Sequence, residues 1–129
     1  MLQALSGAGL TAQDIDYINL HGTGTPSNDS AEGKAVAAVF TGRRRPVEAS
    51  STKGATGHAL GAAGALEAVI CALALRHGLL PGSAHTQRVA PSLGFEYLCG
   101  NRQRPIARAL SNSFGFGGSN CALVLGRAG

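Results

Sequence analysis

Two histidines and one lysine lie in short glycine-rich segments, and together they could stabilise an oxygen that gains negative charge during a reaction. His21 begins the segment HGTGTP, whereas Lys53 and His58 begin and end the segment KGATGH. A neutral imidazole donates one N–H, and a single fixed donor of this kind lowers a barrier by roughly 3–4 kcal/mol. The charge of Lys53 would disfavour a protonated ring and so help to keep His58 neutral. These residue types could form an oxyanion-stabilising pair if the two segments meet in space, although a histidine near glycines is more often structural.

Acidic and hydroxyl side chains near the histidines could support this group, although each also has an ordinary structural interpretation. Asp29 and Glu32 would share one face of a helix, so they could hold Lys53. Their charge alone would also favour a helix N-terminus. Thr23 and Thr25 are residues common in turns.

A third glycine-rich segment, NSFGFGGSN, contains two phenylalanines. Phe114 and Phe116 could border a substrate cavity or belong to the core. The second segment is not a nucleotide-binding loop of the Walker type, because Lys53 precedes the glycines instead of opening the following helix. The histidines form no HxxxH or HExxH pair, so we expect no metal site and no other cofactor.

The elements around these segments predict that the two histidines converge. Residues 15–20 and 47–51 read as strands, and each strand leads directly into a histidine-bearing segment. A helix should follow each segment, the first capped by Asn28, Asp29 or Ser30 and the second ending near His77 before Gly78. Residues 82–105 read mostly as loop, and residues 106–111 and 121–125 read as two more strands. Loops that follow neighbouring parallel strands emerge at one edge of a sheet, so the order indicates an α/β fold with its chemistry there.

Composition limits the possible functions. The chain has 129 residues, of which 44% are hydrophobic and 14% charged, which indicates one domain with a core and excludes a disordered chain. The net charge of +4 comes largely from arginines at residues 43–45 and 102–108, with no interleaved aromatic residues, so we expect no nucleic-acid binding. A solvated loop and a surface for an acidic protein both remain possible for these arginines.

Targeting and redox signals are few. The three cysteines form neither a CxxC pair nor a disulfide framework, so we interpret them as structural residues in a reducing compartment and predict a cytoplasmic protein. The N-terminus lacks the pattern of a signal peptide. The longest apolar stretch, residues 59–75, contains Glu67 and is short for a membrane span, so we expect a buried helix and no membrane span.

Taken together, HGTGTP, KGATGHALGAAG and NSFGFGGSN, in this order and spacing, resemble the β-ketoacyl synthase family. The resemblance covers nearly the whole chain but only the second half of that family's catalytic domain. It implies a thiolase-like fold in which residues 1–129 form a C-terminal half, with a mixed sheet flanked by helices. It also implies an acyltransferase that joins an acyl thioester to malonyl-acyl carrier protein by decarboxylative Claisen condensation, in fatty-acid, polyketide or polyene synthesis.

The resemblance assigns roles to the residues already singled out. His21 and His58 match the two histidines that stabilise the enolate formed by decarboxylation, and Lys53 matches the lysine of the same site. Asp29 and Glu32 match the acids that contact this lysine.

Further residues correspond to substrate contacts. Thr23 and Thr25 match the threonines that touch the pantetheine arm of the carrier protein, and Phe116 matches the phenylalanine that gates access of the acyl chain. The family's nucleophilic cysteine lies in the first half of the domain, and none of the cysteines at positions 71, 99 and 121 has its setting. We therefore expect the isolated chain to be inactive.

Two hypotheses follow for what the chain does. As part of an enzyme, it should act with an N-terminal half that carries the cysteine, with acyl carrier protein, and in a homo-oligomer. As a non-catalytic chain-length-factor-like protein or orphan half-domain, it would only bind a partner. The joint presence of His21, Lys53 and His58 favours the enzyme.

Overall fold

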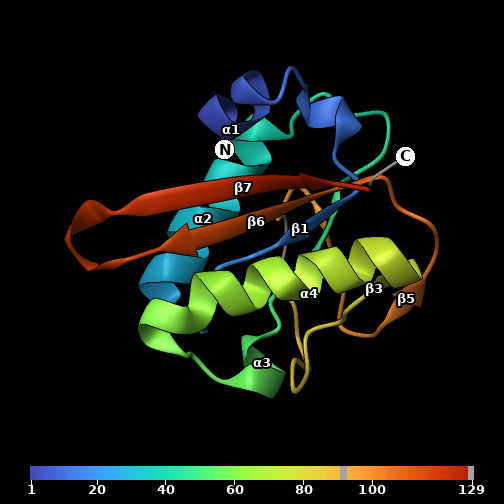
Figure 1. The fold of residues 1–129 in the computed structure, drawn as a ribbon. Coiled ribbons are helices and arrows are strands. Elements are labelled where there is room, and N and C mark those ends of the chain that lie inside the picture. Colours follow the sequence, from blue (N-terminus) through green and yellow to red (C-terminus); the bar gives the residue numbers. More distant parts are fainter. Residues whose placement is uncertain (91–92, 128–129) are drawn as a thin grey trace.

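The fold is a five-stranded mixed sheet with helices on both faces, as the resemblance implied (Figure 1). The computed structural model describes residues 1–90 and 93–127. The main strands are β1 (Tyr17–Asn19), β2 (Glu48–Ser50), β4 (Glu96–Tyr97), β6 (Arg108–Phe114) and β7 (Asn120–Gly126). The helices are α1 (Leu2–Gly7), α2 (Pro26–Val39), α3 (Lys53–Thr56) and α4 (Ala63–His77). Strands β3 (Leu79–Leu80) and β5 (Arg102–Gln103) form a separate small ladder.

The order of strands in the sheet is β4-β2-β1-β6-β7. Strands β4, β2, β1 and β6 run parallel, and β7 returns antiparallel to β6. Because β1 and β2 are parallel neighbours, the segments that follow them leave the sheet at the same edge. This topology places the two histidine-bearing segments side by side, as the sequence predicted.

Each face of the sheet has its own apolar core. On one face, α1 and α2 contribute Leu5 and Val36 against Ile18 and Leu110 of the strands. On the other face, α4 packs Cys71, Ala74 and Leu75 against Tyr17 and Ala109, among others. Alternation along β1 produces this division, since Tyr17 and Ile18 point to opposite faces. Both cores hold the strands that carry the site.

Several boundaries differ from the sequence prediction. Helix α2 begins at Pro26 after Thr25, not at the predicted caps Asn28, Asp29 or Ser30, because proline has the fixed φ of a first helical residue. Strands β4 and β5 lie in the region predicted as loop, and each has only two residues. Strands of two residues are stabilised by pairing with β2 and β3, and they are too short to show an alternating pattern in the sequence.

Helix α4 is apolar on both its inner and its outer face. Its side toward the sheet is buried, but Leu66, Val69 and Leu73 are 37–56% exposed, and Leu123 of the neighbouring β7 is 46% exposed. Residues Leu60–His77 are long and apolar enough to cross a membrane, a property that core helices share. The contacts of α4 with β6 and β7 support the prediction of a core helix, although its outer face is uncovered in this chain.

Candidate active site

His21 and His58 converge at the sheet edge. The two rings meet edge to face with centroids 5.3 Å apart, although the residues lie on different segments. His21 is 5% exposed, whereas His58 is exposed at the surface. On its other side, the His21 ring contacts the ring of Phe114, with centroids 5.5 Å apart. The predicted convergence of the histidines is therefore met in the structure.

The segment HGTGTP is held by carboxylates of α2. One Glu32 oxygen accepts the backbone N–H of His21 at 2.9 Å, and the other accepts that of Gly22 at 2.8 Å. The side-chain amide of Asn112, on β6, donates to Glu32 at 3.1 Å. Asp29 accepts the N–H of Gly24 at 3.3 Å. Both acids therefore fix the backbone of the loop that carries His21.

The predicted contact of Lys53 with Asp29 or Glu32 is wrong. Among the described residues, the carboxylate that pairs with the Lys53 ammonium is Glu67 of α4, and both side chains are buried. Helix α4 faces the end of β2, where Lys53 begins α3, whereas the acids of α2 are used by the backbone N–H groups of the histidine loop. Burial raises the pKa of Glu67, and the lysine only partly offsets this.

Lys53 acts on His21 and not, as the sequence suggested, on His58. Its Nζ lies 3.4 Å from Nδ1 of His21. Burial of the His21 ring, together with the charges of Lys53 and His58, lowers the pKa of His21 to about 4. At neutral pH this ring is therefore uncharged, as a hydrogen-bond donor in an oxyanion site requires.

The hydrogen bonds at the two Nδ1 atoms fix which nitrogen carries the proton. The backbone N–H of Leu60 donates to Nδ1 of His58 at 3.1 Å, so the proton of a neutral ring must be on Nε2. At His21, donation from the Lys53 ammonium to Nδ1 would likewise place the proton on Nε2. Each ring then offers one Nε2–H donor, and the edge-to-face contact keeps the two rings together.

The buried interior beside this group is rich in oxygen acceptors. Four buried oxygens have no hydrogen-bond partner among the described residues, on Asn19, Glu67, Ser111 and Asn112. One of them is the second carboxylate oxygen of Glu67, whose other oxygen pairs with the Lys53 ammonium. The described residues contain no group of three or more His, Cys, Asp or Glu side chains arranged to hold a metal ion.

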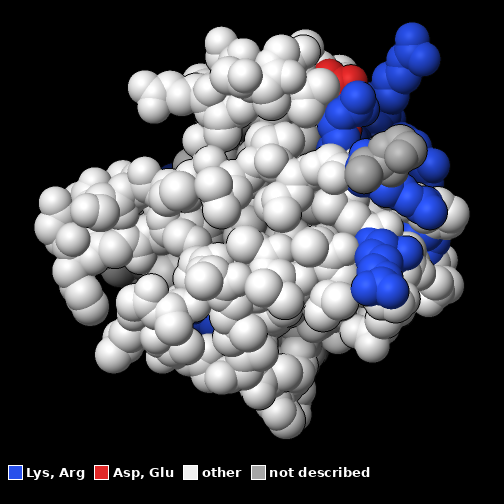
Figure 2. Space-filling model, viewed as in Figure 1, with Lys and Arg blue, Asp and Glu red and all other residues white. Residues whose placement is uncertain are grey.

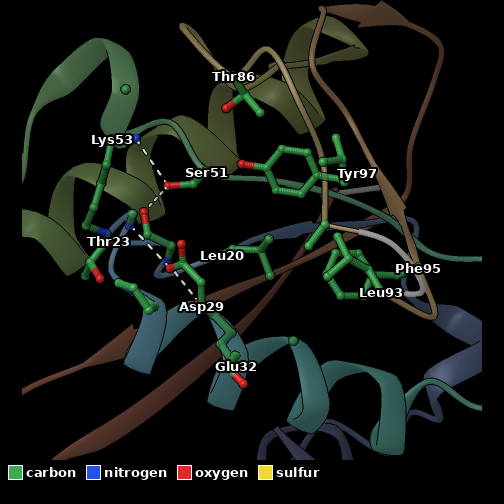
Figure 3. Close-up of a pocket in the computed structure, with 18 of the residues that line it drawn as sticks. Leu20, Thr23, Asp29, Glu32, Ser51, Lys53, Thr86, Leu93, Phe95 and Tyr97 are labelled. Carbon is green, nitrogen blue, oxygen red and sulfur yellow. Dashed lines mark hydrogen bonds between the residues drawn. The ribbon is translucent and has the colours of Figure 1, made fainter.

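A cavity of about 780 Å³ opens beside the site, between α2, the end of β2, and residues 84–90 and 93–97. Thr23, Lys53 and His58 line it, and Figure 3 shows how Thr23, Ser51 and Lys53 gather at one end, with Leu93, Phe95 and Tyr97 at the other. The Thr23 and Thr25 hydroxyls are 2.8 Å apart, and Thr25 lies outside the lining.

The expectation that Phe116 borders this cavity is wrong for the chain alone. Phe116 is 96% exposed, at the turn between β6 and β7, which Figure 1 shows extending beyond the sheet. The phenylalanine that reaches the site is Phe114, through its contact with His21. Strand β6 continues to Phe114, so this ring is set by the sheet, whereas Phe116 lies past the strand end with no surface to pack on.

The three cysteines differ in their surroundings. Cys71 is fully buried in α4, and burial raises the pKa of its thiol to about 12. Cys99 and Cys121 are exposed, and none of the three forms a disulfide. A thiol that stays protonated at neutral pH is a poor nucleophile, which fits a structural role for Cys71.

Basic side chains gather on one side of the molecule, over β5 and the end of the chain (Figure 2). Part of this charge has a structural use, because Arg102 and Arg104 both pair with the buried carboxylate of Glu48 on β2. Arg43 donates to the backbone oxygen of Ala12. These arginines tie loops to the sheet as well as meeting solvent.

Comparison with known proteins identifies close relatives of this arrangement. The family described as beta-ketoacyl synthase, C-terminal domain, matches residues 1–87. A mitochondrial 3-oxoacyl-[acyl-carrier-protein] synthase from Arabidopsis thaliana is 42% identical over 96% of the chain. Nodulation protein E from Rhizobium sp. (strain N33) is 41% identical, also over 96%.

Solved structures agree. The ishigamide ketosynthase/chain length factor matches 99% of the chain with a TM-score of 0.93 and 33% identity. A ketosynthase in complex with its chain length factor, from Xenorhabdus doucetiae, matches 99% with a TM-score of 0.86 and 42% identity. The chain spans 28% and 31% of the two curated relatives and 32% of each of these structures.

Proposed function

The chain belongs to the β-ketoacyl synthase family, with the fold of its C-terminal part, and we propose that it supplies the decarboxylation half of a condensing active site. The reaction is the decarboxylative Claisen condensation of an acyl thioester with malonyl-acyl carrier protein. The observation that carries the proposal is the pair of edge-to-face imidazoles with a lysine against the buried one.

The geometry supports a specific division of labour. Loss of carbon dioxide from the malonyl group sends the electrons of the broken C–C bond onto the thioester oxygen, and an enolate forms. The Nε2–H groups of His21 and His58 donate to this oxygen. The enolate carbon then attacks the acyl thioester on a cysteine of the N-terminal half, and the cysteine leaves as a thiolate. Lys53 keeps His21 uncharged, and Glu67 balances the lysine.

Access to the site fits a long thioester arm. Thr23 and Thr25 lie at the outer end of the histidine segment, and Thr23 lines the cavity that also reaches Lys53 and His58. Hydroxyls at this position can bind the amides of a phosphopantetheine arm, so acyl carrier protein is the proposed donor of the malonyl group. One similar solved structure is that of an acyl-carrier protein in complex with its ketosynthase.

The uncovered apolar surface supports a partner. Leu66, Val69 and Leu73 on α4 and Leu123 on β7 leave an exposed apolar face beside the site. We assign this face to the N-terminal half that carries the nucleophilic cysteine, and we expect the assembled enzyme to be a homo-oligomer. A cytoplasmic location is proposed from the three free cysteines.

A non-catalytic role, like that of a chain length factor, is the second candidate, because two of the similar structures contain such a protein. A protein that only binds a partner needs no uncharged buried imidazole beside an ion pair. The joint geometry of His21, Lys53 and His58 therefore favours catalysis.

The experiment replaces either histidine by alanine in an enzyme reconstituted from this chain and an N-terminal half with the cysteine. Decarboxylation of malonyl thioester should fall by about 10²–10³-fold in His21→Ala or His58→Ala, since each removes one donor to the enolate. Acylation of the cysteine, followed by intact mass, should persist. His77→Ala, at the exposed end of α4, is the control. Unchanged decarboxylation in both histidine variants would contradict the proposal, and the chain alone should take up no acyl group.

A further inference from the structure

The hydroxyl of Ser51 joins the two segments that carry the histidines. Ser51 follows β2 and is 7% exposed. Its Oγ donates to the backbone oxygen of Gly22 at 2.8 Å and accepts the backbone N–H of Lys53 at 3.4 Å. Figure 3 shows these bonds as a short chain between the His21 segment and the start of α3. One small side chain thus contacts the residue after His21 and the lysine that approaches the His21 ring.

The contact depends on a glycine at position 22. Gly22 has a φ of +43°, and a Cβ at this residue would lie 2.5 Å from Cβ and 2.7 Å from Oγ of Ser51. Any larger residue would push the two segments apart or displace the serine. The absence of a side chain at Gly22 therefore lets the hydroxyl reach the carbonyl.

A second serine fixes Ser51 from the opposite side. The backbone N–H of Ser51 donates to Oγ of Ser83 at 3.0 Å, and the N–H of Ser83 donates to the oxygen of Leu98 at 2.8 Å. Ser83 is 2% exposed, so it is as deeply buried as Ser51. Ser83 holds the end of β2, and among the described residues it has no hydrogen bond to either histidine segment, which makes it a matched comparison.

The distance between the Lys53 ammonium and Nδ1 of His21 is set by the relative position of these two segments. Glu67 holds the ammonium from α4, and Glu32 holds the backbone N–H of His21 from α2. These two carboxylates are on different helices, and neither bonds to both segments. Among the hydrogen bonds of the described residues, the Ser51 hydroxyl is the side-chain group that bonds both to the Lys53 backbone and to the His21 segment.

We propose that Ser51 is a positioning residue that keeps Lys53 against the His21 ring. The inference rests on the proposed function for its catalytic meaning, although the positioning itself is a statement about two side chains. Without the hydroxyl, the two segments lose their common bond, and the lysine can move away from the ring while keeping Glu67. A shift of about 1 Å in a catalytic group can cost up to about 10²-fold in rate.

Four charged or titratable groups surround His21 and decide what a titration would show. Burial lowers the pKa of His21 most, Lys53 and His58 lower it further, and Asp29 of α2 raises it. Glu32 binds the backbone N–H of His21. Since the Ser51 hydroxyl contacts none of the other three directly, its removal should act through Lys53 alone.

The test compares Ser51→Ala with Ser83→Ala in the reconstituted enzyme, with two measurements. The pKa of His21, followed by NMR of labelled histidine, should rise from about 4 toward the ordinary 6.5 in Ser51→Ala, by about 1 unit, and stay unchanged in Ser83→Ala. Malonyl decarboxylation should fall about 10-fold in Ser51→Ala at pH 6 to 8 through displacement of the catalytic group, with about a further 2-fold loss at pH 5, where a ring with a pKa of about 5 is half protonated. Acylation of the cysteine should persist.

Equal behaviour of the two serine variants would overturn the proposal, because a general loss of stability affects both. If Ser51→Ala does not fold, Ser51→Cys keeps a weak donor and should give an intermediate pKa. The titration of His21 tests the positioning role of Ser51 separately from the proposed function of the chain. A raised pKa with no decarboxylation in the wild type would leave Ser51 as the positioning residue and remove the proposed function. An unchanged pKa of His21 in Ser51→Ala, together with normal wild-type decarboxylation, would remove the positioning role of Ser51 and leave the proposed function.

Discussion

The segment HGTGTP and the turn GFGGS, at the tip of NSFGFGGSN, are both rich in glycine, yet the contacts of the described residues fix the first far more firmly than the second. The backbone around His21 is held by Glu32, by Asp29 and by the Ser51 hydroxyl. In the second segment, the turn after β6 has one backbone bond, from Gly115 N–H to the oxygen of Ser119, and Phe116 is 96% exposed.

The difference shows which part of the site this chain builds by itself. The two imidazole rings meet without any other protein surface, because α2 holds the backbone of His21 and α4 holds the lysine beside it. The residue that would gate the acyl chain needs a surface to pack on, and the described part of this chain provides none. Glycine content therefore does not distinguish a rigid loop from a free one, whereas the buried polar partners of the loop do.

The largest expected effect comes from breaking the ion pair beneath the fixed loop. Glu67→Ala leaves the Lys53 ammonium buried without its carboxylate, and removing one partner of a buried pair costs about 3–5 kcal/mol. The free energy of unfolding, measured by urea denaturation, should fall by this amount. The double variant Lys53→Met/Glu67→Leu, which removes both charges, should lose much less. A loss in the double variant as large as that in Glu67→Ala would argue that packing and not charge holds this region.

A smaller loss of unfolding free energy should follow from weakening the hydrogen bonds between Glu32 and the backbone of the His21 segment. In Glu32→Gln, the amide cannot accept from both the His21 and Gly22 N–H groups, so the unfolding free energy should fall by about 2 kcal/mol. Asp29→Asn is the matched control, because Asp29 is exposed and binds the same loop, and its loss should stay below about 1 kcal/mol. Equal losses would mean that the burial of the carboxylate is not what fixes the loop.

Much of this fixed region could be predicted from the sequence. The strand pattern and the order of segments predicted that His21 and His58 converge, and the rings do meet. In the sequence pattern, Glu67 only interrupts an apolar stretch, and it was not predicted to be part of the site. A lone acid in an apolar helix is nevertheless a signal, because a buried charge requires a partner, and Lys53 is the lysine closest to it in the sequence.

The remaining features depend on tertiary contacts that leave little trace in the sequence. Ser51 is a small polar residue at the end of a strand, and only the proximity of Gly22 makes its hydroxyl useful. The pairing of Glu32 with backbone N–H groups instead of Lys53 follows from where α2 begins, at Pro26, which the capping pattern misplaced. Phe116 was assigned by likeness to a family, and its surroundings are not determined by this chain alone.

The charge state of His21 gives a third, pH-dependent comparison. Its folded pKa of about 4 lies below the 6.5 of a free histidine, so between these values the unfolded chain binds more protons than the folded one. Stability should therefore fall as the pH drops from about 6.5 toward 4, by at most about 1.4 kcal/mol per pH unit from this residue. The measurement is urea denaturation at several pH values, with His21→Gln to remove the effect. If the variant shows the same slope as the wild type, other groups are responsible.

The smallest expected effect separates the two phenylalanines. Phe116→Ala should change the unfolding free energy of this chain by less than about 0.5 kcal/mol, because an exposed side chain loses no packing. Phe114→Ala removes the ring that contacts His21, and aromatic pairs contribute about 0.5–1.5 kcal/mol beyond their burial. Its cost in unfolding free energy should therefore exceed 1 kcal/mol.

The same two variants can be measured after the N-terminal half is added, and the stability cost of each then shows which ring the partner covers. A partner that covers the turn between β6 and β7 would raise the cost of Phe116→Ala in the complex above its value in the chain, as measured by denaturation of both. An unchanged, negligible cost in the complex would show that the turn stays in solvent there too, and the role of Phe116 as a gate would then have to be abandoned.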